Sequence, residues 1–257
     1  MPVRRAHTIA ALASMFAASG TLAFQPLVTD DTGTQGAGGN QLEAALTRTT
    51  VDVPTGTAKA GDVAVVYTRG LTDALDVFLE LGRQRIDDTV TTESGPTNPT
   101  VGAKWRFYEN ERKTSLALKP QLHAAVSAEN EAKGMGTGKA SYDLALILTQ
   151  EMPWGAVHAN LSAGRERYRD PTDDTSTRAF SVAPVWNLDA HWKLAVDLGV
   201  SRSTNQGTSE QSRFGELGAI YSPNADLDVA LGFIREKNRD SGDVAKTATA
   251  GVTWRFK

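Results

Sequence analysis

The feature that most constrains the fold of this chain is an alternation of apolar with polar or small residues, which repeats from Gln41 to Phe256. Clear examples are LDVFLELG at residues 75–82, SYDLALIL at residues 141–148 and LDVALGF at residues 227–233. Alternation with period two is typical of β-strands, whose successive side chains point to opposite faces. Because no stretch sustains the spacing of an amphipathic helix, the sequence predicts an all-β protein.

The length of the alternating runs points to strands that cross a membrane. About twelve runs of roughly ten residues follow one another, and a tilted transmembrane strand needs about 9–11 residues. Strands of soluble sheets average only about five or six residues. The expected strands lie near residues 41–50, 60–69, 74–86, 99–108, 114–126, 139–149, 156–168, 177–187, 191–203, 211–222, 226–237 and 245–256.

The connections between these runs divide into two kinds. Those after every second strand are short, as in GLTD at residues 70–73, EMPWG at residues 151–155 and SPNA at residues 222–225. The others are longer and polar, as in DDTVTTESGPTN, SAENEAKGMGTG and RDPTDDTST. Short periplasmic turns and longer extracellular loops are the layout of outer-membrane barrels. We therefore expect a closed antiparallel transmembrane β-barrel of about twelve strands.

The alternation separates an apolar face from a polar one, as lipid outside and water inside would require. A soluble β-sandwich also alternates, with its apolar face inward, but strand length, loop asymmetry and export favour the barrel. The residues expected to face lipid include Trp192, Leu194, Val196, Leu198 and Val200 in one strand, and Leu116, Leu118, Leu122 and Val126 in another. An aromatic girdle on the periplasmic side is expected from Tyr67, Trp105, Phe107, Trp154, Trp186, Trp192, Tyr221, Trp254 and Phe256.

The N-terminus has the pattern of an export signal. Arg4 and Arg5 precede a short apolar run at residues 9–18, and Thr21-Leu22-Ala23 supplies small residues for cleavage after Ala23. The run is too short for a spanning helix, which needs about 20 apolar residues. The expected organisation is a signal peptide at residues 1–23, a polar Gly-rich lead-in segment at residues 24–40 and a barrel at residues 41–257. The expected location is the outer membrane of a Gram-negative bacterium.

Charge and composition exclude several classes of protein. The formal net charge is -3 and there is no cysteine, so neither a disulfide framework, a thiolate metal site nor a nucleic-acid-binding surface is expected. GMGTG at residues 134–138 lacks the Lys-Ser/Thr ending of a phosphate loop, and DPTDD at residues 170–174 is interpreted as a solvated acidic loop. No cofactor and no metal site are expected.

The lead-in segment contains a motif that suggests a protease. Asp31-Thr32-Gly33-Thr34 matches the D-T-G-[ST] turn of aspartic proteases, which use two carboxylates that share one proton. Here Val28, Thr29 and Asp30 precede the motif where a strongly apolar strand should stand, and no second D-T-G follows. The sequence predicts a polar segment that lies on the periplasmic side or folds into the lumen.

The segment QPLVTDDTGTQGAGGNQLEAAL, residues 25–46, resembles the opening of the Putative MetA-pathway of phenol degradation family. YTRGLTDALDVFLELG and YSPNADLDVALGF fit the same pattern. The resemblance implies an exported outer-membrane barrel that transports small molecules, often encoded near aromatic-degradation pathways. The expected function is a channel or transporter for small solutes, aromatic or hydrophobic compounds among them. Its expected partners are outer-membrane lipid, a small solute and the barrel assembly machinery, which would bind the C-terminal strand ATAGVTWRF; no nucleic acid is expected.

The polar face supplies the candidate functional residues. The residues expected to face the lumen are Glu43, Asp76, Glu80, Lys104, Arg106, Lys119, Gln121, His123, Asp143, His158, Asn160, Lys193, Asp197, Glu216, Asp228 and Arg255. Lys104, Arg106 and Lys119 form a candidate basic ladder, opposed by an acidic ladder of Asp76, Glu80, Asp143 and Asp197 across a constriction. A twelve-stranded barrel is narrower than large porins, so a small-solute channel or a mostly filled barrel is expected.

Two alternatives to a channel remain open. An outer-membrane phospholipase needs a Ser-His pair near lipid, whereas His123 and His158 are expected in the lumen and His191 in a periplasmic turn. A non-conducting structural or adhesin barrel is compatible with the long loops. The sequence therefore favours a protein that is not an enzyme.

Overall fold

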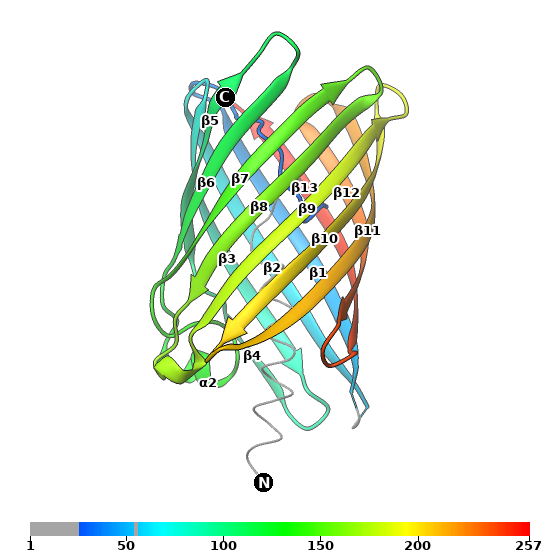
Figure 1. Cartoon of the computed structure of the whole chain (residues 1–257). Helices are drawn as coiled ribbons and strands as arrows, with labels where there is room; N and C mark the ends of the chain where they lie inside the picture. The colour runs from blue at the N-terminus through cyan, green and yellow to red at the C-terminus, as the bar shows by residue number, and fades with distance from the viewer. Residues whose placement is uncertain (1–25, 54–55) are drawn as a thin grey trace.

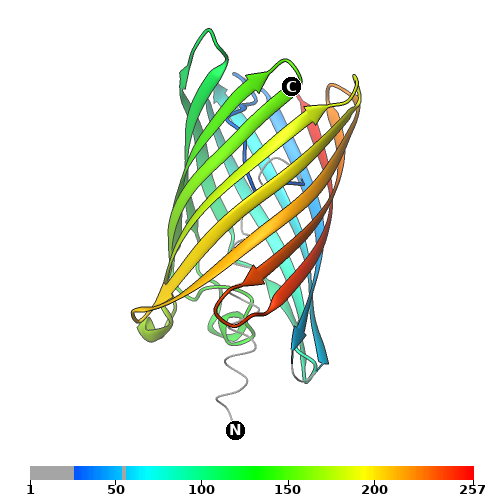
Figure 2. The same cartoon turned by 45° about the vertical axis from the view of Figure 1, so that its right-hand side comes forward.

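The computed structural model describes residues 26–53 and 56–257, so the expected signal peptide lies outside the described residues. These residues form one antiparallel sheet that closes into a barrel (Figures 1 and 2). Of the thirteen strands, β4 pairs only with β3, and the other twelve make the wall. The pairing of β1 with β13, from Asn40↔Phe256 to Val51↔Ala245, closes the barrel. The predicted barrel of twelve strands is confirmed.

The strands match the alternating runs of the sequence closely and extend several of them. Their bounds are β1 Asn40–Val53, β2 Gly56–Thr72, β3 Leu75–Asp87, β4 Thr92–Pro96, β5 Thr100–Glu109, β6 Thr114–His123, β7 Ser141–Met152, β8 Gly155–Glu166, β9 Thr175–Asn187, β10 Trp192–Asn205, β11 Thr208–Asn224, β12 Leu227–Asn238 and β13 Val244–Phe256. One short helix, α2 (Ala128–Ala132), and one 3-10 turn, η1 (Pro171–Asp173), lie in the loops. Among the described residues, no helix is long and apolar enough to cross a membrane.

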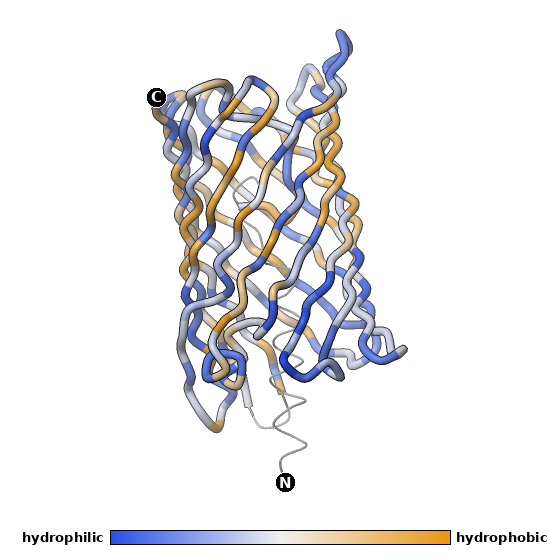
Figure 3. The backbone as a smooth tube through the Cα atoms, turned by 90° about the vertical axis from the view of Figure 1, so that its left-hand side faces the viewer, coloured by the Kyte–Doolittle hydropathy of each residue, from blue (hydrophilic) through white to orange (hydrophobic). Residues whose placement is uncertain are grey.

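Hydrophobic residues gather around the middle of the barrel (Figure 3), and the large ones among them are exposed on its outer wall. Leu46, Leu217 and Leu231 are each more than half exposed, whereas their strand neighbours Ala45, Glu216 and Ala230 are buried in the interior. Such exposure in water would leave an apolar surface far larger than soluble monomers carry. The outward side chains are therefore the surface that lipid covers.

Aromatic side chains mark the periplasmic end, where the short turns lie. Trp154 and Trp186 stack with ring centroids 5.6 Å apart, and Trp192 contacts Tyr221 at 4.8 Å. Trp154 lies in the turn between β7 and β8, the other three rings come from strands, and all four are exposed on the outer wall. Side chains of this kind, apolar with a polar tip, are enriched at the interface of a bilayer. Their position confirms the predicted girdle.

The extracellular side is less uniform than the sequence predicts. β10 and β11 stay paired to Asn205↔Thr208, so a tight turn replaces the expected loop. Gln206 and Gly207 both have positive φ there, +45° and +82°, which is the geometry of a hairpin turn that follows the strand twist. The residues before Thr100 add strand β4 to the edge of β3. In the described part of the chain, the long extracellular loops are the segments around α2, η1 and β4.

One residue assigned to lipid lies elsewhere. The alternation places Val126 on the outer wall, but β6 ends at His123, and Val126 is 6% exposed. It belongs to the loop that folds back over the barrel, where its N–H donates to the carbonyl of Thr137. The prediction is wrong because the chain leaves the sheet before the apolar pattern ends.

The lipid-facing assignment predicts a depth-dependent cost for charge. Leu231→Arg places a guanidinium near the middle of β12 and should destabilise the folded barrel by about 2–4 kcal/mol. Leu188→Arg, in an exposed periplasmic turn, should cost about 0–1 kcal/mol. Denaturant unfolding in phospholipid vesicles measures both. Equal costs would show that the middle of β12 does not face lipid.

Candidate functional site

The interior of the barrel is crossed by the lead-in segment, residues 26–39, which runs inside the wall rather than outside it (Figure 1). Pro26 and Leu27 pack over glycines of β11 and β12: a Cβ on Gly218 would lie 2.9 Å from Cγ of Pro26. Leu27 also joins a buried cluster with Ala183, Val185 and Ala195. Small inward residues on these strands therefore make room for the segment.

A carboxylate of the lead-in segment bridges two lysines of the wall. Asp30 accepts from Nζ of Lys104 on β5 at 3.0 Å and from Nζ of Lys119 on β6 at 2.7 Å, one lysine on each carboxylate oxygen. The side chains of Asp30 and Lys119 are almost fully buried. Buried charges are tolerated when they are paired and hydrogen-bonded. We call these two ion pairs, which join Lys104, Asp30 and Lys119, the lumen clamp.

The backbone of the lead-in segment is held as well. In the orientation that satisfies both partners, the Asn160 carboxamide accepts from the Asp30 N–H at 2.7 Å and donates to the Asp30 carbonyl at 3.0 Å. Asp197 of β10 accepts from both the N–H and the hydroxyl of Thr29, each at 2.7 Å. Farther along, the N–H of Thr32 donates to Oγ1 of Thr149 at 3.1 Å. The segment is thus bonded to strands on several sides of the lumen.

The Asp-Thr-Gly motif makes a turn within this segment. Oδ1 of Asp31 accepts from the N–H of Gly33, so the carboxylate caps its own turn. The hydroxyl of Thr32 is buried against Ser115, at 2.5 Å. After the turn, the N–H of Gln35 donates to both oxygens of Asp76, at 3.2 and 3.0 Å. The motif positions backbone in the lumen, and its carboxylates lack the shared-proton pair of a protease.

The segment leaves the lumen through a close backbone contact. A Cβ on Gly70 of β2 would lie 1.8 Å from the carbonyl oxygen of Gly36, so only glycine fits there. Gly36 and Gly38 both have positive φ, which glycine adopts without strain. The N–H of Gly38 donates to the carbonyl of Gly70 at 3.0 Å. This contact directs the chain into β1.

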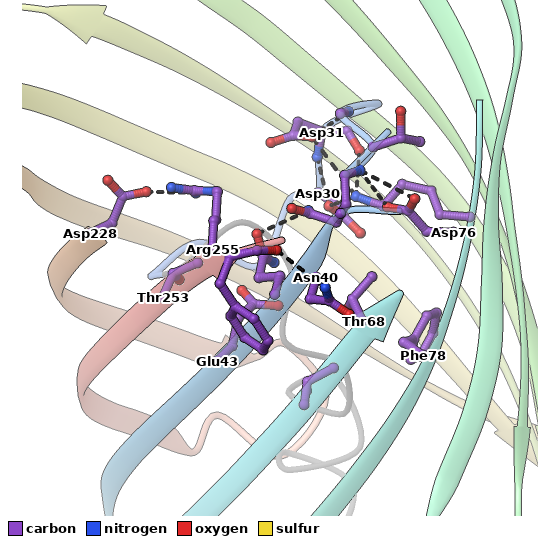
Figure 4. Close-up of a pocket in the computed structure, with 18 of the residues that line it drawn as sticks. Asp30, Asp31, Asn40, Glu43, Thr68, Asp76, Phe78, Asp228, Thr253 and Arg255 are labelled. Carbon is purple, nitrogen blue, oxygen red and sulfur yellow. Dashed lines mark hydrogen bonds and ion pairs between the residues drawn. The ribbon is translucent and has the colours of Figure 1, made fainter. Parts of the chain in front are cut away.

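A cavity of about 630 Å³ adjoins the lumen clamp (Figure 4). Glu43, Asp76 and Phe78 line it together with the clamp and the C-terminal residues of β13. Arg255 enters it while paired to Asp228 at 2.7 Å. Nζ of Lys119 lies 5.2 Å from the ring centroid of Phe78. The cavity therefore offers opposed charges and one aromatic face to a small solute.

The extracellular mouth is closed separately by the loop that carries α2. Met135 of this loop is buried in an apolar cluster with Val51, Ala58, Ile86 and Ala245, which point inward from four strands. The loop is tied to its neighbour by an ion pair from Arg169 to Glu131 at 2.7 Å. Chain segments thus lie within the barrel at two levels, held by an apolar loop contact and by the lumen clamp.

The structure places the sequence-predicted site residues on the lumen side of their strands, but it brings only some of them together. Lys104 and Lys119 share Asp30 as an ion-pair partner. Arg106 lies nearer the periplasmic rim, where it donates to the carbonyl of Asp73 at 3.0 Å. The remaining candidates are Asp76, which binds the lead-in segment, and Glu80, which lines the cavity, with His123, Asp143, His158, Lys193, Asp197 and Glu216 distributed along the wall.

Two facing ladders of opposite charge do not form. Asp143 is engaged by His123 at 2.6 Å and by Gln121 at 2.7 Å, and Asp197 is occupied by Thr29. The acid between the lysines is Asp30, which the sequence analysis did not select. The signal in the sequence was the pair of acids that follows Pro26-Leu27-Val28-Thr29, together with lysines on the polar face of two strands.

No metal site accompanies these carboxylates: no group of three or more His, Cys, Asp or Glu side chains in the described chain has the placement to hold an ion. The histidines that the structure describes have other partners. Nδ1 of His123 lies 2.8 Å from Oγ1 of Thr100, and Nδ1 of His158 lies 3.0 Å from Oγ1 of Thr149. Both pairs are inside the barrel, away from lipid.

The match to known families agrees with this architecture. A family model described as Putative MetA-pathway of phenol degradation matches residues 23–256, nearly the whole chain. The chain belongs to this family. A search of curated proteins finds no significant match. The resemblance of residues 25–46 to the family is therefore confirmed, and the match extends to the last strand.

Solved structures share the fold at low sequence identity. The COG4313 outer membrane channel from Pseudomonas putida F1 is similar with a TM-score of 0.68 at 17% identity, over 88% of this chain and 98% of that chain. The translocator domain of the autotransporter NalP from Neisseria meningitidis has a TM-score of 0.54 at 13% identity, over 99% and 98%. The NanC porin has a TM-score of 0.57 at 9% identity, over 83% and 98%. The fold is that of outer-membrane barrels.

The lumen clamp predicts how the lead-in segment is held. Asp30→Asn leaves Lys119 without its buried counter-charge and leaves Lys104 only the more distant Asp31. Removing one partner of a buried ion pair typically costs about 3–5 kcal/mol. The segment should detach, and a cysteine introduced as Thr32→Cys, in a chain without native cysteine, should react faster with a soluble maleimide. Asp31→Asn is the matched control, since Asp31 lies 3.8 Å from Lys104. Equal labelling rates in all backgrounds would contradict the clamp.

Proposed function

We propose that this protein is an outer-membrane channel for small solutes whose path is closed from within by the lead-in segment. The observation that carries the proposal is the bridge of Asp30 between Lys104 and Lys119, because it holds a chain segment across the lumen. A barrel of twelve strands is narrow, so one segment is enough to obstruct it. Solute passage then requires the lead-in segment to move.

The chemistry of the clamp suggests which solutes pass. When Asp30 leaves, two buried ammonium groups lose their counter-charge, which is costly unless another anion replaces it. A solute carboxylate would supply that anion, and the ring of Phe78 beside Lys119 would contact an aromatic or apolar body. We therefore propose small carboxylates as preferred solutes, aromatic acids among them.

The phospholipase alternative has no supporting geometry. Of the histidines in the described part of the chain, His123 and His158 lie in the lumen, and His191 lies in a periplasmic turn with its Nδ1 2.9 Å from the carbonyl oxygen of Ser222. A lipase would need a Ser-His pair where lipid arrives. A calcium-dependent phospholipase assay on purified protein should give no serine-inhibitor-sensitive turnover.

Conductance in planar bilayers tests the channel and its closure. The wild-type protein should conduct weakly, and Asp30→Asn should raise the open fraction several-fold because the segment is released. Lys113→Gln is the control, since Lys113 pairs with Glu151 in the periplasmic turns and not with the lead-in segment. A protein that conducts in neither form is a structural barrel, which would contradict the proposal.

Charge in the lumen should set selectivity. Lys104→Glu with Arg106→Glu replaces two inward positive charges by negative ones, so the reversal potential in a salt gradient should shift toward cation selectivity. In cells, uptake of benzoate should exceed that of its methyl ester and of a neutral sugar. Lys104→Gln with Lys119→Gln should remove the preference for benzoate. Unchanged reversal potentials and equal uptake would contradict a path past these lysines.

A further inference from the structure

The outer wall carries basic side chains toward the extracellular ends of the strands, beyond the apolar band. Three pairs of them stand directly opposite one another on neighbouring strands: Arg178↔Arg202, Arg213↔Lys237 and Arg235↔Lys246. Like charges in direct cross-strand contact destabilise a sheet. Three such pairs on consecutive strands, from β9 to β13, therefore need a source of negative charge.

That charge does not come from the described protein. Within residues 26–53 and 56–257, no ion pair reaches Arg178, Arg202 or Arg213. Asp240, whose Oδ2 accepts from the backbone N–H of Gln211 at 2.6 Å, lies nearby, but it forms no ion pair with a base of the described residues. By contrast, the lysines inside the barrel are matched by Asp30. The outward arginines remain exposed cations.

The arginines surround a hollow with two kinds of lining. Arg178, Arg202, Arg213 and Arg239 supply its basic part, and Leu161, Phe180 and Val200 supply an apolar part. The volume of this hollow is about 430 Å³. Along β10, Val200 is one outward position closer to the membrane centre than Arg202. The positive charge at the extracellular rim is suited to an anionic lipid headgroup, and the apolar surface closer to the membrane centre is suited to the acyl chains.

We propose that this hollow binds a phosphate of the phosphorylated glycolipid that forms the outer leaflet of the outer membrane. Guanidinium groups bind phosphate oxygens in bidentate geometry, and several arginines can share one phosphate. The acyl chains of the same lipid would lie against Leu161, Phe180 and Val200. Binding of the phosphate offsets the repulsion between Arg178 and Arg202. The site lies on the outer wall and is independent of the solute path.

The test uses full-length protein, folded in detergent and freed of glycolipid. Bisphosphorylated lipid A should raise the melting temperature of the barrel and appear bound in native mass spectra, whereas dephosphorylated lipid A and phosphatidylglycerol should do neither. The triple variant Arg178→Gln, Arg202→Gln and Arg213→Gln should lose at least about tenfold in affinity for lipid A. Without lipid, this variant should be at least as stable as the wild type because the like-charge contact is gone.

The matched control removes three bases at the same end of the opposite wall: Arg48→Gln, Lys59→Gln and Arg83→Gln. None of these three faces another base across the strands. The control should keep the affinity for lipid A within about twofold of the wild type. Equal loss in both triple variants would mean diffuse attraction without a site, and equal binding of phosphatidylglycerol would rule out the glycolipid. Either result overturns the proposal.

Discussion

The constraint on which this structure depends is that backbone N–H and C=O groups in lipid must find partners within the protein. A sheet meets that requirement only if it has no free edge, and the pairing of β1 with β13 removes the edge here. The tilt of the strands, the alternation of their side chains and the separation of an apolar outside from a polar inside all follow from this closure. The barrel is stable in the membrane because the outside, not the core, carries most of the large apolar side chains.

Closure creates a second problem, because a barrel of this size has an interior that wall side chains do not fill. The lead-in segment occupies that space and brings the acid that the wall lacks between Lys104 and Lys119. On the outside, Arg178, Arg202 and Arg213 collect near the extracellular rim without an ion pair to any acid of the described residues. Inside the barrel, the chain itself supplies the compensating charge; outside, we propose that a lipid phosphate supplies it.

The Asp-Thr-Gly motif illustrates how context decides the role of a short sequence. In a protease the carboxylate is one of a pair and faces substrate. Here Asp31 caps a turn through the N–H of Gly33, and the turn presents Thr32 to buried hydroxyls of the wall. The glycines that follow permit the tight exit past Gly70. The residues that suggested catalysis are those that fit a chain segment into a lumen.

The strands, the side of each strand that faces lipid, the position of the aromatic girdle and the family can all be inferred from the amino-acid sequence. These depend on local alternation and on short motifs, which a single segment displays. Predictions from the alternation were wrong where the chain departs from the pattern, at Val126 and at the tight turn of Gln206 and Gly207. Only the tertiary structure decided that Asp30 bridges two lysines, that Met135 closes the mouth and that Arg178 faces Arg202. Asp30 and Lys119 are 89 residues apart, and alternation assigns a face but not the register or loop path that makes residues neighbours.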